Sequence, residues 1–291
     1  MAQRYGNGDR EKTSIELISC GLVSGLLQAG VFNPWDRALY LSIKDNRAFL
    51  HMDNFRNPFS GVAQTIVQRA LSTGLYFPLE EIYRNQLSKV VGVGAPSTFA
   101  AGILSGITSG VIMNPIAAVK YHYWGTPTGK ENFLSTSLEM FKRGGVRVFV
   151  VGTGATVNRD LVFGGVYALM RHELHTSAKN DEDRKNNKKK TPPGFLVNLI
   201  SACIATVASS PWNYVRNVHY ATEKGQSPLP SWAIVRGLWD DAMREGSLFE
   251  RVRFLQTRLR IGWGTVRVLL VAKNGLALQN SPTSQIAHTL Y

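Results

Sequence analysis

Cysteine is nearly absent from the chain, which has two in 291 residues, Cys20 and Cys203, each within an apolar segment. Neither lies in the Cys-x-x-Cys or Cys/His spacing that a metal site requires. A His-x-x-His pair, His172 and His175, borders a hydrophilic loop, where we expect solvated side chains. The sequence contains no phosphate-cradling glycine loop, catalytic triad or paired carboxylates. It therefore predicts neither a metal site nor an enzyme.

Acidic residues are also scarce, with 20 Asp and Glu against 33 Lys and Arg, which gives a net charge of +13. Such a charge is typical of nucleic-acid binding, of association with an anionic membrane, or of anion transport. Nucleic-acid binding requires a basic face with interleaved aromatic residues. Here the basic residues are scattered or gathered in a polar loop at 185–190, so we expect no nucleic-acid partner. The N-terminal stretch MAQRYGNGDREKTS predicts no secretory signal and no cleaved presequence.

Long apolar stretches, by contrast, occur six times, at about 15–40, 60–83, 97–124, 148–170, 194–220 and 258–278. Each reaches the roughly 20 residues that a helix needs to cross a hydrocarbon layer. Polar and ionisable residues interrupt them, and at membrane depth such groups should face a bundle interior or a water-filled cavity. A soluble helical repeat protein is the alternative, but it requires more charge than 102–124 or 194–214 carry. The pattern predicts an all-α membrane protein with six transmembrane helices.

Three of these stretches end in a proline after a similar run-up. They are Gly21-LVS-Gly25-LLQAGVFN-Pro34, Gly102-ILS-Gly106-ITSGVIMN-Pro115 and Asn198-LIS-Ala202-CIATVASS-Pro211. Small residues four apart allow helices to approach closely in a membrane. The prolines are 81 and 96 residues apart, and a hydrophilic insert at 176–193 can absorb the difference. We therefore predict one domain over 1–291, built from three tandem repeats at about 14–90, 96–176 and 194–280.

Short amphipathic segments at 133–143 and 232–244 precede two of the even-numbered stretches. They are followed by Gly145-Val-Arg-Val-Phe149 and Gly246-Ser-Leu-Phe249, respectively. The first repeat keeps only Asn57-Pro-Phe59-Ser-Gly61 and has little room for such a segment. Its amphipathic helix is therefore predicted to be shortened or missing.

A proline within a helix removes a backbone hydrogen bond and kinks the helix. Kinks at Pro34, Pro115 and Pro211 would bring the helix ends together, where charged residues just beyond them can meet. At these positions the chain resembles the mitochondrial carrier family, in which each repeat has Pro-x-acid-x-x-base after a Gly-rich helix. The resemblance spans about residues 14–278 and includes the Gly-xxx-Gly run-ups, the Gly-Val-Arg-x-Phe segment and arginines in the even helices.

The resemblance implies a fold of six transmembrane helices in three pseudo-threefold repeats around a central cavity, with short helices on the matrix side. It places the chain in the mitochondrial inner membrane as a multi-pass protein, with the lipid bilayer as its surroundings. It implies no cofactor, and bound cardiolipin is left open.

Two gates of the family are thin in this sequence. For the matrix gate, the acid position holds Asp36 in the first repeat, Ala117 in the second and Asn213 in the third. The base position holds Leu39, Lys120 and Arg216 in the same order. Asp36 with Lys120 is the one pairing of family type that these residues allow. For the cytoplasmic gate, Glu81 and Arg84 match in the first repeat, whereas the second offers His172 and His175 and the third Ala272 and Lys273.

Substrate contacts in the family lie on the even helices, about thirteen residues before the acid position of the second gate. By that count they fall near Gln68, at Arg159 and Asp160, and at Arg260. An adjacent arginine and aspartate resemble carriers of amino acids and can hold the two charges of a zwitterion. A structural ion pair between helices is the alternative interpretation.

Two functions follow from the resemblance. The first is a carrier that moves a small metabolite, an amino acid or a carboxylate, by alternating access. The second is a carrier-derived structural subunit that no longer transports and packs with protein partners in a larger inner-membrane respiratory complex. The thinned gates favour the second, since alternating access needs closure at both sides; the preserved scaffold and the charges at Arg159, Asp160 and Arg260 favour the first.

Overall fold

The computed structural model describes residues 29–92, 94–125, 133–184, 194–222 and 227–279, and these ranges form helices with no strand among them. A helical segment covers 29–44. It is followed by the 3-10 helix η1 (Met52–Phe55) and by α2 (Val62–Val91), α3 (Ala95–Gly125), α4 (Phe133–Gly144), α5 (Arg147–Val150), α6 (Thr153–Arg184), α7 (Gly194–Ala221), α8 (Ser231–Met243), α9 (Leu248–Arg258) and α10 (Ile261–Gln279). The predicted all-helical class is confirmed.

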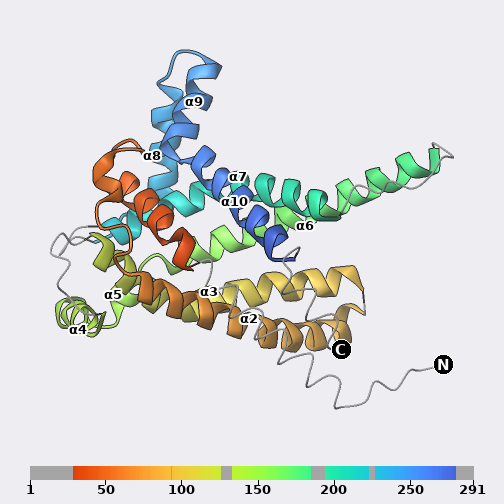
Figure 1. Cartoon of the computed structure of the whole chain (residues 1–291), viewed down its shortest axis with the longest axis horizontal. Helices are drawn as coiled ribbons and strands as arrows, with labels where there is room; N and C mark the ends of the chain where they lie inside the picture. The colour runs from red at the N-terminus through yellow and green to blue at the C-terminus, as the bar shows by residue number, and fades with distance from the viewer. Residues whose placement is uncertain (1–28, 93, 126–132, 185–193, 223–226, 280–291) are drawn as a thin grey trace. The chain divides into compact units, whose positions relative to one another are not determined.

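The chain divides into two compact units, one of residues 1–160 with 212–237 and the other of 161–211 with 238–291. The boundary passes through α6 after Asp160 and through α7 directly after Pro211. The first unit therefore contains the residues that follow all three prolines of the repeated frame. Within it α2 and α3 form a hairpin and lie side by side (Figure 1).

Among the described residues, one helical stretch, Phe99–Gly125, is both long enough and apolar enough to cross a membrane, with a mean hydropathy of 1.5. A shorter apolar helix covers Ile261–Leu270. Helices α2, α6 and α7 have 30, 32 and 28 residues, which is long enough to span, but polar and charged side chains lower their hydropathy. The expectation that each of the six stretches is a span is therefore not confirmed by the described residues.

The short segments between the long helices agree with the sequence pattern. Helix α4 covers the predicted 133–143 and α8 the predicted 232–244 to within a residue. The first repeat has the single 3-10 turn η1 in that place, as its short connection predicted. Helix α6, however, continues to Arg184, well into the stretch expected to be a hydrophilic insert, of which 185–193 lie outside the described residues.

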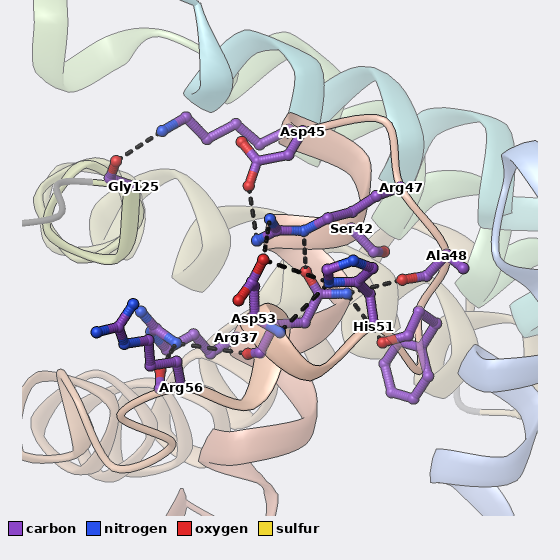
Figure 2. A network of polar contacts seen from close by, with 12 residues as sticks. Arg37, Ser42, Asp45, Arg47, Ala48, His51, Asp53, Arg56 and Gly125 are labelled. Atoms are coloured by element: carbon purple, nitrogen blue, oxygen red, sulfur yellow. Dashed lines mark hydrogen bonds and ion pairs between the residues drawn. The ribbon is translucent and has the colours of Figure 1, made fainter.

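Polar contacts hold this first connection in place of a packed amphipathic helix (Figure 2). Arg47 Nε donates to Asn54 Oδ1 over 2.6 Å, and Asn54 Nδ2 donates to the carbonyls of Ala48 and Phe49. Arg37 donates through Nη1 to the carbonyl of Arg56 over 2.7 Å. The guanidinium of Arg37 thus holds the connection in place, whereas the carboxylate of its neighbour Asp36 pairs with Arg69 of α2.

Buried asparagines, each just before a proline, make the same contact in the first two repeats. Asn33 Nδ2 donates to the carbonyls of Pro58 and Ser60 over 3.0 and 3.1 Å. Asn114 Nδ2 donates to those of Phe149 and Val151 over 2.8 and 3.0 Å. Each side chain thereby ties its odd helix to the two carbonyls that precede the next even helix. We call this contact the asparagine latch; it satisfies buried polar groups that would be costly to leave unpaired.

The latch spans different lengths of chain. The contacts of Asn33 lie 25 and 27 residues further along the sequence, and those of Asn114 lie 35 and 37 further. The ten additional residues of the second repeat accommodate α4, for which the first repeat has only η1. In the third repeat Ser210 holds the equivalent position, and its hydroxyl donates to the carbonyl of Val207 in the same helix.

Aromatic side chains pack on the glycine that precedes an even helix, again in two repeats. Gly61 has φ 72°, and a Cβ there would lie 2.6 Å from Trp124 Nε1. Gly152 has φ 79°, and a Cβ there would lie 3.1 Å from Tyr220 Cε1. Trp124 and Tyr220 each follow the proline of the next repeat by nine residues. These equivalent contacts extend the repeat symmetry from the sequence to the packing.

Candidate functional site

Four buried aromatic side chains meet just beyond the prolines, and we call them the proline-end cluster. Tyr40, Tyr121, Trp124 and Tyr220 come from the segment 29–44, from α3 and from the last part of α7. The rings of Tyr121 and Tyr220 stack at 4.5 Å between centroids, and those of Tyr40 and Tyr121 lie 4.9 Å apart. Tyr40 also donates to the carbonyl of Tyr220, and Tyr220 donates to Asn114 Oδ1 over 2.7 Å.

The three proline ends are thus closed by aromatic packing and hydrogen bonds. Each aromatic pair contributes about 0.5–1.5 kcal/mol beyond the area it buries. The sequence predicted that the helix ends meet, but it predicted charged residues as the closing groups. Tyrosine or tryptophan at six or nine residues after each proline is the signal that identifies this cluster in the sequence.

The two bases of the predicted matrix gate lie against the cluster. Lys120 is buried, with Nζ 4.9 Å from the ring centre of Tyr121 and 4.7 Å from that of Trp124. Arg216 has Cζ 5.7 Å from the Tyr121 ring centre and donates to the hydroxyl of that tyrosine over 3.2 Å. Cation–π contacts of desolvated groups are worth about 2 kcal/mol. The bases thereby stabilise the closed end through the rings.

Asn213 takes part as well, since it accepts a hydrogen bond of 2.9 Å from Arg216 one helical turn away. In the family's gate pattern, Asn213 has no basic partner and Arg216 has no acidic partner. In the structure Arg216 is bound by this amide and by the hydroxyl of Tyr121.

Two adjacent residues of α2 bind the remaining gate residues. Gln68 Oε1 accepts from Lys120 Nζ over 2.6 Å, and Arg69 Nη2 pairs with Asp36 Oδ2 at 2.9 Å. The pairing of family type that the sequence allowed was Asp36 with Lys120. The structure connects each of them to α2, so that this helix links the segment 29–44 with α3. Arg69 was not identified from the sequence, although it directly follows a residue that was.

Arg159 and Asp160 form an ion pair with each other on α6, with Arg159 Nε donating to Asp160 Oδ1 over 2.7 Å. The second oxygen, Asp160 Oδ2, lies 3.0 Å from the position that a Cβ would take at Gly110 of α3. A side chain at Gly110 would displace this carboxylate. Gly106, which belongs to the predicted small-xxx-small frame, has nothing within 4 Å of its Cβ position, so the close approach in α3 occurs at Gly110.

A left-handed residue precedes each of three even helices. The residues are Gly61 before α2, Gly152 before α6 and Arg260 before α10, where φ is 57°. In each case the carbonyl accepts a hydrogen bond from the backbone N–H four residues further along, that of Thr65, Thr156 and Gly264 respectively. The three helices therefore begin in the same way, and this start provides a common register for counting along them.

That register gives a second way to select the third of the predicted substrate contacts, which the count from the second gate placed at Arg260. Gln68 and Arg159 both lie seven residues after the left-handed residue, and the equivalent position in α10 is Arg267. Arg260 itself precedes the helix, and its Nη1 donates to the carbonyl of Thr257 over 2.6 Å. The count from the sequence ran back from the second gate, where the third repeat offers Ala272 and Lys273 and therefore no acid that fixes the starting position.

The predicted cytoplasmic-gate residues lie on the far part of α2. Arg84 forms an ion pair with Glu80 one turn earlier, and Glu81 is exposed. The pair of family type was Glu81 with Arg84, so the structure shifts the acid by one residue. His175, Ala272 and Lys273 lie outside the residues whose side chains are described.

A cavity of about 260 Å³ lies beside the proline-end cluster. Tyr220 belongs to its lining, and its basic wall includes His122, Arg143, Arg147 and His219. Within the described ranges no three His, Cys, Asp or Glu side chains gather as metal ligands do. The chemistry of the site is therefore that of cations, amides and aromatic rings.

Comparison with known proteins adds an independent observation. A family model described as "Mitochondrial carrier protein" matches residues 92–181. A mitochondrial glycine transporter of Kluyveromyces lactis is 22% identical over 288 residues, which cover 88% of this chain and 96% of the relative. A protein of the same name from Sclerotinia sclerotiorum is 21% identical over 257 residues, 72% of this chain and 78% of the relative. Another from Emericella nidulans is 22% identical over 228 residues, 67% and 69% of the two chains.

Repeated helix pairs that converge on a closed end with polar residues beside it are typical of a transporter, and the relatives indicate a transporter rather than an enzyme. The chain is similar to the mitochondrial carrier family, through the family model over residues 92–181 and through relatives at 21–22% identity. This similarity supports a location in the mitochondrial inner membrane.

Proposed function

We propose that the protein carries a small zwitterionic metabolite, with glycine as the first candidate, across the mitochondrial inner membrane by alternating access. The proposal includes six membrane-spanning helices, arranged as one pair in each of three repeats. Its main support is the proline-end cluster, in which aromatic residues that follow all three prolines pack together within the first unit. A transporter requires such a closure, and it must be reversible.

Charged and amide groups next to the closed end support the substrate class. Gln68 and Arg69 of α2, and Arg159 and Asp160 of α6, offer both a cation and an anion. Ionisable groups at membrane depth are costly and mark substrate pathways by default. An arginine binds a carboxylate, and an aspartate binds an ammonium group, as the two ends of an amino acid require. The names of the relatives agree with this chemistry.

Reconstitution tests the proposal. Purified protein in liposomes loaded with unlabelled glycine should exchange external labelled glycine above the level of empty liposomes. The register of α10 predicts that Arg267→Ala lowers the exchange rate at least tenfold, since an interaction with an ionised group is worth about 1.5–3 kcal/mol. Arg260→Gly is the matched control, because Arg260 precedes the helix and glycine suits its left-handed backbone.

A panel of amino acids, carboxylates and inorganic anions should accompany glycine in these assays. Absence of uptake for every compound in the panel, with protein shown to be folded, would refute transport. Equal loss of exchange in Arg260→Gly and Arg267→Ala would refute the register assignment while leaving transport intact.

The alternative of a non-transporting structural subunit is supported by one observation. Aromatic packing and buried cations close the proline end. Opening this end would require the packed rings to separate, and not only surface ion pairs to break. Such a protein would co-migrate with a respiratory complex on a native gel after mild detergent extraction. Migration as a single copy, together with measurable exchange, would exclude this alternative.

A further inference from the structure

The cavity beside the proline-end cluster has a basic lining that the proposed transport does not use. Its volume is about 260 Å³, and the ends of α3 and α7 line it together with α4, α5 and residues 227–228. Four of the lining side chains are basic, namely His122, Arg143, Arg147 and His219, whereas no Asp or Glu of the described ranges belongs to the lining. All of these residues lie in the first unit, so the cavity is contained within one compact part of the structure.

Arg147 is the cation of this lining that is most available to a ligand. It is exposed and has no ion pair or hydrogen bond with another described residue. Arg143 forms an ion pair with Glu139 of α4, and its side chain is 42% exposed. Because a guanidinium has five N–H donors, this pair leaves donors of Arg143 for a second anion. Two arginine charges thus line the cavity against one carboxylate.

Groups from α7 and from the chain after it add hydrogen-bond donors to the lining. His219 Nε2 lies 3.0 Å from the carbonyl of Leu229, which can only accept, so this nitrogen carries the proton. The Nδ1 atom of the same ring is buried and has no hydrogen-bond partner among the described residues. A nearby anion favours the imidazolium form, in which Nδ1 becomes a donor as well. The hydroxyl of Ser227 is a further donor on the lining.

We propose that this cavity is a binding site for a small, soluble anion that carries a phosphate group. The planar fork of an arginine matches the oxygen atoms of a phosphate through two parallel hydrogen bonds, and two such forks line the cavity. Pockets for drug-sized ligands have about 300–1,000 Å³, so the smaller volume here suits inorganic phosphate or a small phosphate ester. Binding at this site does not depend on the proposed transport.

A ligand in this cavity would contact a ring of the proline-end cluster. Tyr220 lines the cavity, stacks on Tyr121 and donates to Asn114 Oδ1. The anion would tie α4 and α5, which carry the two arginines, to the end of α7. Since a ligand stabilises the state that it binds more tightly, the bound anion would favour the closed arrangement and slow glycine exchange. This consequence, unlike the binding itself, rests on the proposed function.

Thermal unfolding of the full chain in detergent tests the binding, with sodium phosphate or pyrophosphate compared with sodium chloride at equal ionic strength. Phosphate at ten times its Kd should raise the apparent Tm by about 3 °C. Arg147→Gln should raise the Kd for phosphate about three- to tenfold, a modest factor because the guanidinium is exposed. The double variant Arg143→Gln with Arg147→Gln should lose the shift. Lys142→Gln is the matched control, since Lys142 is an exposed cation of α4 outside the lining, and it should retain the shift.

A second titration, with cardiolipin and with phosphatidylcholine as the neutral control, distinguishes a soluble anion from a lipid headgroup. A shift with cardiolipin that Arg147→Gln removes, combined with no shift from phosphate or pyrophosphate, would overturn the assignment to a soluble anion. Equal phosphate shifts in wild-type protein and in the double variant would overturn the site itself, as would an equal loss in Lys142→Gln. If the double variant fails to fold, the comparison of Arg147→Gln with Lys142→Gln decides alone.

The two proposals fail in different ways. Absence of exchange for every compound of the transport panel refutes transport, and the phosphate shift and its loss in the double variant would still establish the site. Measurable glycine exchange without a phosphate shift removes this inference and leaves transport standing.

Discussion

Substitution of Gly61 by alanine should destabilise the protein strongly, although it adds a single methyl group. The residue has φ 72°, a left-handed conformation that costs a side chain about 1–2 kcal/mol. The new Cβ would lie 2.6 Å from Trp124 Nε1, so the indole must move. Its hydrogen bond of 2.9 Å to the Ser60 carbonyl would weaken, and overpacking adds about 1–3 kcal/mol. We expect a total loss of about 2–5 kcal/mol.

Thermal unfolding in detergent at one fixed scan rate measures this loss as an apparent Tm, which is kinetic in part for a membrane protein. At about 2 °C per kcal/mol for a chain of this size, Gly61→Ala should lower Tm by roughly 4–10 °C. Gly106→Ala is the control, since nothing lies within 4 Å of its Cβ position and helix-interior glycine is unfavourable by about 0.5–1 kcal/mol. Its Tm should be unchanged or slightly higher. Equal Tm values for the two variants would refute the steric reasoning.

A second substitution separates the two contributions to the effect of Gly61→Ala. Trp124→Phe removes the atom nearest to the new methyl group, so the double variant should be less destabilised than the two single changes predict together. The coupling should be about 1 kcal/mol or more, as for residues in direct contact. Strict additivity would show that the left-handed backbone, and not the indole, accounts for the loss.

Three further predictions concern other parts of the chain. Arg260→Gly should raise Tm by about 2–4 °C in the same assay, because it removes a left-handed arginine worth roughly 1–2 kcal/mol; a lower Tm would contradict this. Tyr220→Phe should cost about 1–3 kcal/mol in a denaturant or thermal assay, since it leaves the buried Asn114 Oδ1 without its donor, and a loss near zero would argue against that bond. Hydrogen bonds from the Ser247 side chain and backbone lower the pKa of the exposed Glu250, so the stabilisation of α9 is complete above the ordinary value near 4.5 and is lost as pH falls through the lowered pKa. Hydrogen exchange in α9 between pH 6 and 3 should show this loss, and Ser247→Ala should remove the pH dependence.

The helix pairs and the short segments could be predicted from the sequence because their signals are local. The apolar run of α3 and the amphipathic pattern of α4 each depend on neighbouring residues alone. The shortened connection of the first repeat followed from the number of residues available between its helices. The family resemblance rested on the proline frames, and the match of residues 92–181 agrees with the second of them.

The partners of the site residues could not be predicted in this way. Spacing places Asp36 and Lys120 at the end of their helices, but it does not indicate that α2 supplies Arg69 and Gln68 as partners. Rotation by one residue on a helix turns a side chain by about 100°, so a neighbour of an identified residue can hold the decisive contact. Arg69 illustrates this, since it follows Gln68 and was passed over.

The third repeat shows a second difficulty. A count back from the second gate needs an acid that marks its starting position, and Ala272 and Lys273 of the third repeat supply none. The backbone conformation at Arg260 restores the register because left-handed geometry marks the start of the helix whatever the length before it. Structural landmarks, rather than distances in sequence, therefore align the third repeat with the others.

The asparagine latch closes a stretch of 25 to 27 residues in the first repeat and of 35 to 37 in the second, each time on two carbonyls just before an even helix. The connection that follows the odd helix can thus differ in length and content, as η1 and α4 show, while its two ends remain fixed relative to the neighbouring helices. This connection, and not the helix end that carries the proline-end cluster, is accordingly a natural place for epitope tags, fluorescent labels or inserted domains. Evolution can add a regulatory module there in the same manner, without disturbing the helices that the latch holds.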